Sequence, residues 1–317
     1  MASALTGNFV QYVSGQGGSD LFGQGGGRLG SMGTANHDTI VLDNSLAARG
    51  GNGNGKGGGG GGSGGGTVVT DTYTSGSSSV DDSQEFNITI EFIGEWSDDL
   101  KAIFIASADY LSSVIEGDLA DITYDGQLID DIVIQASLSD IDGEGGVLGQ
   151  AGPTVVRTAN YLPVQGIMEF DISDAQAYYE SGHFDDIVLH EMMHVLGFGT
   201  LWDNKDLVTT EVDDNGTRRP VDDTIISYYN GSNALASYGD TMLFVETDGG
   251  SGTAGGHWDE ETYQLELMTG YIGYFDPNTE TWSGDNYLAD WSVASLADLG
   301  YELAPGASGL GDVDLIA

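Results

Sequence analysis

The chain has 317 residues, and 50 acidic side chains face only eight basic ones, which gives a formal net charge of −42 at pH 7. Such a charge disfavours binding to nucleic acids and to anionic membrane surfaces, because both carry the same sign as the protein. The absence of cysteine excludes disulfide bonds and thiolate metal ligands. Two interpretations of the acidity stay open: a surface adapted to salt or calcium-rich surroundings, or a chain kept soluble by self-repulsion.

The N-terminal sequence, MASALTGNFVQYVSGQ, lacks the basic start and the continuous apolar stretch of a standard signal peptide. No stretch of the chain approaches the roughly 18 to 20 consecutive apolar residues that a membrane helix needs. A cysteine-free composition is compatible with a bacterial secreted protein. We therefore expect no membrane insertion and an extracellular, monomeric protein that is exported without a cleavable N-terminal signal peptide.

Residues 1–66 are predicted to be a flexible, glycine-rich N-terminal region. They hold 23 of the 51 glycines of the chain, including an unbroken run from Gly57 to Gly62. A segment of this composition has too little apolar surface to fold by itself. We expect the folded part of the chain to begin near Phe86.

Strands and helices are predicted in mixed order after this region. Phe86–Phe92 alternates apolar and polar residues and predicts a strand, and Asp98–Ile115 has apolar residues at helical spacing. Asp131–Gln135 and Gly166–Asp171 predict two further strands, and Trp291–Gly300 predicts a closing helix that ends at its glycine. This order indicates an α+β fold.

A calcium site is a candidate between the second and third of these strands. Asp140, Asp142 and Glu144 alternate around a glycine, which places hard oxygen ligands on one turn. The segment lacks the full twelve-residue EF-hand pattern, and chance clusters are expected in so acidic a chain.

The most informative segment is His190-Glu191-Met192-Met193-His194. Two histidines four residues apart project from the same face of a helix, where one Zn²⁺ ion can bind both imidazoles. A glutamate beside the first histidine is then placed to act on a metal-activated water. Gly197 is suited to the left-handed turn that ends such a helix.

The residues around this motif favour a metal site over two structural histidines that are hydrogen-bonded inside the core. Apolar residues continue around the helix, so it is predicted to be buried. Buried polar groups need partners, and a metal ion supplies one for the histidines. The alternative of a structural histidine pair is the less favoured interpretation.

Catalytic zinc takes three protein ligands, and a third ligand is expected elsewhere in the chain. Metzincins carry a third histidine three residues after the helix-ending glycine, but that position is Thr200 in this chain. His257 is the candidate, within the sequence GTAGGHW. Met268 follows eleven residues later in a predicted turn and fits the Met-turn beneath a metzincin zinc site.

The chain resembles the leishmanolysin-like metalloproteases, metzincins in which a long insertion separates the helix motif from the third histidine. The resembling segments are HEMMHVLGFG from His190, GGSGTAGGHWDEETYQLELM from Gly249, and SLADLGY from Ser295. The resemblance extends over roughly residues 86–303, and the lack of cysteine is similar to the cysteine-free bacterial type.

This resemblance implies a metzincin-like zincin fold of two lobes. The N-terminal protease lobe would span residues 67–199 and contain a twisted sheet and the metal-binding helix. A loop-rich C-terminal lobe would span residues 200–317 and contain the third ligand and the Met-turn. The resemblance also implies a substrate-binding edge strand just before the zinc helix, at Ile167, Met168, Glu169 and Phe170.

The predicted activity is therefore a zinc-dependent endopeptidase that acts on proteins or peptides. Zinc would be bound by His190, His194 and His257, with Glu191 as general base and Met268 in a structural role. A non-catalytic acidic extracellular protein, binding calcium or acting in adhesion on a protease-like fold, is the main alternative. A different zinc hydrolase, such as an amidase, is a third, although His257 and Met268 favour the metzincin plan.

Overall fold

The computed structural model describes residues 39–41, 68–77, 79–141, 148–213, 224–239, 241–250, 252–276, 281–283 and 285–316. The predicted flexible region 1–66 lies outside these residues apart from Thr39–Val41. The structure begins earlier than expected, because Val69–Thr74 forms a strand that pairs with the strand predicted at Phe86–Phe92. The expectation of a start near Phe86 was therefore wrong.

A six-stranded mixed sheet forms the first half of the molecule, in the order β1-β7-β8-β6-β3-β2. Its three central strands, β3 (Ile88–Ile93), β6 (Ile132–Ser139) and β8 (Pro163–Asp171), are parallel to one another. The flanking strands β2 (Val69–Thr74) and β7 (Gly149–Arg157) are antiparallel to their neighbours. The three residues of β1 (Thr39–Val41) pair antiparallel with the last three of β7.

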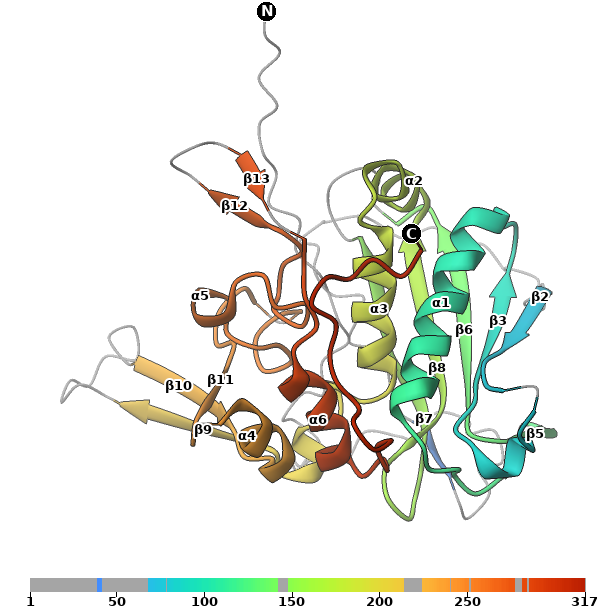
Figure 1. Cartoon of the computed structure of the whole chain (residues 1–317), viewed down its shortest axis with the longest axis horizontal. Coiled ribbons are helices and arrows are strands. Elements are labelled where there is room, and N and C mark those ends of the chain that lie inside the picture. The colour runs from blue at the N-terminus through green and yellow to red at the C-terminus, as the bar shows by residue number, and fades with distance from the viewer. Residues whose placement is uncertain are drawn as a thin grey trace, which may run out of the picture.

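Helices α1 (Asp98–Val114) and α3 (Phe184–Val195) pack side by side on one face of this sheet (Figure 1). The predicted helix from Asp98 is confirmed, and Ser97 caps it by accepting a hydrogen bond from the backbone N–H of Leu100. On the opposite face, the hairpin of β4 (Ile122–Tyr124) and β5 (Gln127–Ile129) packs against Val133, Val155 and Val164 of the sheet. The residues of β3 that face the helices are buried, whereas the alternate residues on its other face are only half-buried.

The prediction that Ile167–Phe170 forms a free edge strand for the substrate is wrong. These residues lie in β8, which is hydrogen-bonded to β6 on one side and to β7 on the other. A strand paired on both sides has no free backbone groups for a peptide. Helix α2 (Ile172–Ser181), which follows β8 directly, was also not expected from the sequence.

The second half has more regular structure than the loop-rich lobe that we expected. Strands β9 (Val208–Asp213), β10 (Thr224–Tyr229) and β11 (Leu243–Val245) form an antiparallel sheet. Helix α6 (Asp290–Leu299) confirms the predicted closing helix and its end at Gly300. Helix α4 (Ser232–Tyr238) packs against α6. The remaining elements are 3₁₀ turns at Asp82–Gln84 and Asp203–Lys205, helix α5 (Glu260–Tyr263) and the hairpin of β12 (Tyr274–Asp276) and β13 (Thr281–Ser283).

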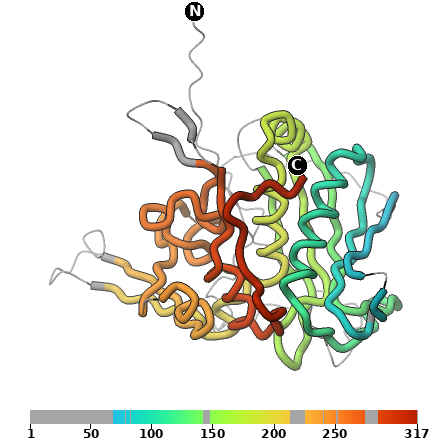
Figure 2. The backbone as a smooth tube through the Cα atoms, viewed as in Figure 1, coloured from blue at the N-terminus to red at the C-terminus, as the bar shows by residue number. Residues whose placement is uncertain are grey.

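The last residues of the chain return to the first half of the molecule. Figure 2 shows this C-terminal tail, in red, running from α6 back toward α1 and α3. Leu303 forms a β-bridge with Ile115 at the end of α1, and the backbone N–H of Leu315 contacts Asp185 in the first turn of α3. Among the described residues, no helix combines the length and the apolar character that crossing a bilayer would need.

Candidate metal centre

Three buried histidines meet at one point between the two halves of the chain. The Nε2 atoms of His190 and His194 lie 2.9 Å apart, and that of His257 lies 3.2 Å and 3.1 Å from them, respectively. All three side chains have no exposed surface. The structure therefore brings the three predicted ligands together, although His257 is 63 residues beyond His194.

A backbone carbonyl holds each of these imidazoles by its other nitrogen. The Nδ1 atom of His190 lies 2.7 Å from the carbonyl oxygen of Leu267, and that of His194 lies 2.8 Å from Phe198 O. For His257 the partner is Thr253 O, at 2.9 Å. A carbonyl oxygen can only accept, so each Nδ1 carries the proton and each Nε2 presents a lone pair to the other two.

Three facing lone pairs need a positive centre. Burial keeps the histidines neutral, because it lowers the pKa of His190 to about 3 and that of His257 to about 4. Burial and the two neighbouring imidazoles hold the pKa of His194 well below its usual value. Neutral imidazoles with unprotonated Nε2 atoms are the form that binds metal, and the Nε2 triangle is a size that Zn–N bonds of about 2.0–2.1 Å can span.

Glu191 is the second unusual group on the same helix. Its side chain is fully buried, and neither carboxylate oxygen has a hydrogen-bond partner among the described residues. Burial raises its pKa to about 8. A carboxylate next to a metal-binding histidine and free of other partners is available to accept a proton from a bound water.

The turn after α3 explains both Gly197 and Thr200. Gly197 has a φ of +110°, as predicted for a left-handed turn, and its N–H donates to His194 O at 3.1 Å. The chain then folds back, so that Phe198 O reaches His194 Nδ1. Thr200 stands where many metzincins have a ligand, and its hydroxyl donates to His194 O at 2.7 Å. The turn therefore contacts His194 both at its ring Nδ1 and at its backbone carbonyl.

The segment that carries His257 packs directly against this turn. The carbonyl of Gly256 lies so close to Gly199 that a Cβ atom on Gly199 would be 2.0 Å from the Gly256 oxygen. Trp258 is fully buried and contacts Phe198 and Trp202, with ring centroids 5.2 Å and 5.0 Å away. Close backbone approach and aromatic packing thus place His257 opposite α3.

Replacing Gly199 by alanine is expected to lower both the free energy of unfolding and the affinity for zinc. Gly199 has a φ of +69°, and the added methyl group would collide with the backbone of the His257 segment. Gly255→Ala is the matched control, because Gly255 has a φ of +84° but no atom within 4 Å of its Cβ position. The control should show only the strain of a left-handed alanine, about 1–2 kcal/mol. Thermal unfolding and zinc titration check this, and equal losses in both variants would contradict the close-approach argument.

Met268 lies in a turn that contacts His190 and the segment that carries His257. It is fully buried, its carbonyl accepts from Trp258 N at 3.0 Å, and the preceding carbonyl, of Leu267, holds His190. Glu266 was not among the predicted site residues, and its buried carboxylate accepts from Met268 N, Ala289 N and the Ser292 hydroxyl. A glutamate between Leu265 and Leu267 in an apolar segment was the available signal. It joins the turn to the start of α6.

The other predicted sites have different outcomes. His183 occupies the N-cap position of α3 and pairs with Asp186, with 3.1 Å between Nδ1 and Oδ2, so it is no member of the histidine triad. Trp202 and Trp258 are fully buried core residues. Of the predicted calcium ligands, Asp140 is described, whereas Asp142 and Glu144 lie outside the described residues.

The sequence comparisons agree with this geometry. A family model described as leishmanolysin, peptidase M8, matches residues 128–301, which is more than half of the chain. The match contains the helix motif, the His257 segment and the turn with Met268. No curated protein matches the chain significantly.

Proposed function

We propose that this chain, which belongs to the leishmanolysin family and is therefore a metallopeptidase that hydrolyses peptide bonds, is a zinc-dependent endopeptidase. The observation that carries the proposal is the convergence of three neutral imidazoles, each held by a backbone carbonyl, on one point. Zinc fits this donor set because it binds imidazole nitrogens in tetrahedral geometry, and catalytic zinc sites have three protein ligands and one open position. A calcium ion, which prefers oxygen ligands, does not fit it.

The chemistry divides between the ion and Glu191. Zinc held by His190, His194 and His257 would supply a Lewis acid that polarises the scissile carbonyl and makes a water molecule more acidic. Glu191 accepts the proton of that water and delivers it to the leaving amine. Burial raises the pKa of Glu191 and so makes its carboxylate a stronger base, and a cation bound at the histidines would favour the ionised form that accepts a proton. The carbonyls of Leu267, Phe198 and Thr253 keep the imidazoles oriented throughout.

The outer edge of β7 is the proposed place for the substrate backbone, in place of β8. Strand β1 covers only Val155–Arg157, and among the described residues no strand pairs with the outer side of Gly149–Thr154. This stretch lies near the triad, since Gly152 approaches Thr200, the residue whose hydroxyl binds His194 O. A peptide added here in extended form would present its carbonyl to the metal centre.

The finer fold assignments belong to the same proposal. We place the Met-turn at Met268 and the boundary between the N-terminal lobe (67–199) and the C-terminal lobe (200–317) just after the helix-ending turn. Two features support this division: the zinc helix and the sheet precede Gly199, and His257 and Met268 follow it. An extracellular location is proposed from the acidic, cysteine-free composition.

The first test is metal content together with proteolysis. Full-length protein purified without chelator should contain one zinc per chain and cleave casein. Treatment with 1,10-phenanthroline should abolish cleavage, and stoichiometric Zn²⁺ should restore it. Protein that binds no zinc at the three histidines would overturn the metal assignment. Zinc-loaded protein that cleaves neither casein nor a peptide library would contradict the proposed endopeptidase activity.

A further inference from the structure

The carbonyl that holds His190 belongs to a peptide unit whose other side faces a buried carboxylate. The Leu267 carbonyl oxygen lies 2.7 Å from His190 Nδ1. The N–H of the same peptide unit, that of Met268, donates to Glu266 Oε2 at 2.6 Å. One planar amide group therefore accepts from the imidazole on one side and donates to the carboxylate on the other. Two consecutive hydrogen bonds thus join His190 to Glu266.

The contacts of Glu266 suit an ionised carboxylate. Its side chain has no exposed surface, and its Oε1 accepts from Ala289 N at 3.0 Å and from the Ser292 hydroxyl at 2.6 Å. The Ser292 oxygen accepts from Trp258 Nε1 at 2.8 Å, which leaves the hydroxyl proton for Glu266. Burial raises the pKa of Glu266 to about 7, whereas the hydrogen bonds from Ser292, Ala289 and Met268 oppose this rise. A cation at the histidines would favour the ionised form as well.

The carbonyls that hold the other two histidines differ in this respect. The N–H that shares a peptide unit with Phe198 O belongs to Gly199 and has no carboxylate partner in the described part of the chain. The N–H beside Thr253 O is that of Ala254, and it donates to a neutral backbone carbonyl at 2.9 Å. Within the described residues, the carbonyl backed by a carboxylate is therefore the one that holds His190.

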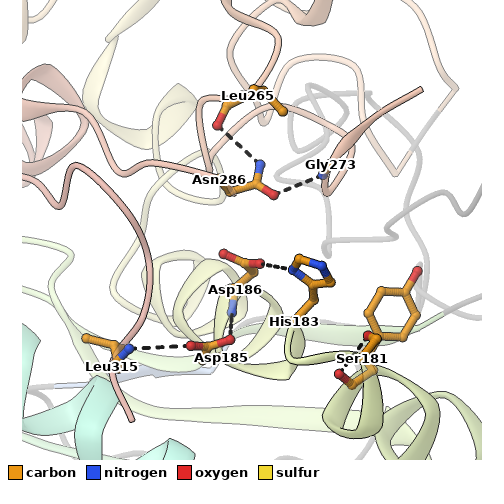
Figure 3. A network of polar contacts seen from close by, with 9 residues as sticks. Ser181, His183, Asp185, Asp186, Leu265, Gly273, Asn286 and Leu315 are labelled. Carbon is orange, nitrogen blue, oxygen red and sulfur yellow. Dashed lines mark hydrogen bonds and ion pairs between the residues drawn. The ribbon is translucent and has the colours of Figure 1, made fainter. Parts of the chain in front are cut away.

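Other contacts fix the loop around this carboxylate (Figure 3). Asn286 is fully buried, and its side chain donates to Leu265 O at 3.2 Å and accepts from Gly273 N at 2.9 Å. The N–H of Leu267 donates to Tyr287 O at 2.8 Å. These bonds hold the turn against the segment before α6 without using the buried charge. The charge therefore has a further effect to explain, beyond the course of the loop.

We propose that Glu266 is a positioning residue that strengthens His190 as a metal ligand through the Leu267–Met268 peptide unit, an inference that rests on the proposed zinc site. A carboxylate that accepts from an amide N–H polarises the amide and makes its carbonyl oxygen a stronger acceptor. A stronger acceptor for the Nδ1 proton makes the opposite nitrogen of the imidazole a better donor to the metal. The same bonds hold the ring in the orientation that faces the other two histidines.

The charge balance of the site supports this role. Three neutral imidazoles would leave the positive charge of zinc uncompensated in a buried place, where a charge without an opposite partner is costly. Glu191 gains and loses a proton in the proposed reaction, so it does not balance the ion throughout. Glu266 would supply a constant negative charge two hydrogen bonds from His190, and it leaves the fourth position of the metal open for water.

Zinc affinity of the full-length protein, measured against a competing chelator, tests the proposal. Glu266→Gln keeps the length of the side chain but removes its charge, and it should raise the Kd for zinc about 10–100-fold, as loss of the outer partner of a ligand does. Glu266→Asp keeps the charge. Its shorter carboxylate can still accept from the N–H two residues on, that of Met268, but it should no longer reach Ala289 and Ser292. This variant should lose stability and yet bind zinc more tightly than Glu266→Gln. Zinc affinity that follows thermal stability across the two variants would show a purely structural role and overturn the proposal.

The matched control is Asp131→Asn in the first half of the molecule. Asp131 is also buried, and its carboxylate accepts from two backbone N–H groups, those of Asn87 and Leu119. The control should lose stability and keep the zinc Kd of the wild type. An equal loss of zinc affinity in Asp131→Asn and Glu266→Gln would show that any buried carboxylate has the same effect, and it would contradict the relay through the peptide unit.

A proton NMR measurement on the zinc-loaded wild type gives a test that needs no variant. The Nδ1 proton of His190 should resonate furthest downfield of the three ligand histidines, because its carbonyl acceptor is backed by a carboxylate. In Glu266→Gln this resonance should move upfield, while those of His194 and His257 keep their positions. Three equivalent resonances in the wild type, or an equal shift of all three in the variant, would overturn the proposal. A wild type that binds no zinc would overturn the metal assignment itself, a result that is separate because it involves no substitution.

Discussion

Replacement of Glu191 by glutamine is expected to lower kcat at least about a hundred-fold while one zinc ion per chain is retained. General acid–base catalysis by a positioned side chain contributes roughly 10²–10⁴-fold, and glutamine cannot accept the proton of the attacking water. The variant should fold at least as well as the wild type. The Glu191 carboxylate is fully buried without a partner, and a neutral amide of the same shape is less costly to bury.

Zinc content, thermal unfolding and casein cleavage are the measurements. The critical result is a loss of cleavage without a loss of zinc, because Glu191 does not belong to the histidine triad. A variant that keeps its zinc and its cleavage rate would show that another group acts as the base. Loss of zinc in the variant would instead place Glu191 among the ligands. The matched control is Gln176→Glu on the exposed face of α2, which alters a residue remote from the motif in sequence and should leave kcat unchanged.

Replacement of His257 by alanine is expected to cause a loss of zinc and, with it, of zinc-dependent activity. Mutating the outer partner of a metal ligand already costs 10–100-fold in affinity, so removal of the ligand itself should cost at least about a hundred-fold. The residual pair on α3 would keep its Nε2 atoms 2.9 Å apart but would present only two of the three donors. Zinc titration against a competing chelator measures the change.

His183→Ala provides the control for this experiment. His183 lies at the beginning of the same helix, but its Nδ1 contacts Asp186 rather than the triad. The His183→Ala variant should therefore retain zinc affinity and casein cleavage. If His257→Ala kept full zinc affinity, the third ligand would have to come from another residue. If His183→Ala lost zinc as strongly, the effect would reflect the stability of α3 and not ligation.

Much of the local structure could be predicted from short-range patterns. The alternation of Phe86–Phe92, the helical spacing after Asp98 and the glycine at the end of α6 each reflect geometry within a few residues, and the structure confirms all three elements. The resemblance to leishmanolysin-like proteins is confirmed by the family match. The early strand β2 was missed because it follows a glycine-rich segment and is almost entirely exposed.

The position of the substrate edge could not be obtained in this way. The strand predicted at Gly166–Asp171 lies within β8, but no feature of these residues indicates which strands lie on either side. The neighbouring strand β7 contains Gly149, Gly152 and Pro153 and carries little strand signal. β7 pairs antiparallel with β8 on the side that was expected to be free. The free edge of the sheet therefore belongs to β7 and not to β8.

The sequence by itself determined that two histidines and a glutamate share one buried helix, because the helical period is a local property of the backbone. It also determined the family, through motifs whose order along the chain is distinctive. Only the tertiary structure decided that His257 meets the helix, that three carbonyls fix the imidazole tautomers, and that Glu266 is linked to His190 through one of these carbonyls. These contacts join residues far apart in the chain, and the packing of the whole core, not any local pattern, brings them together.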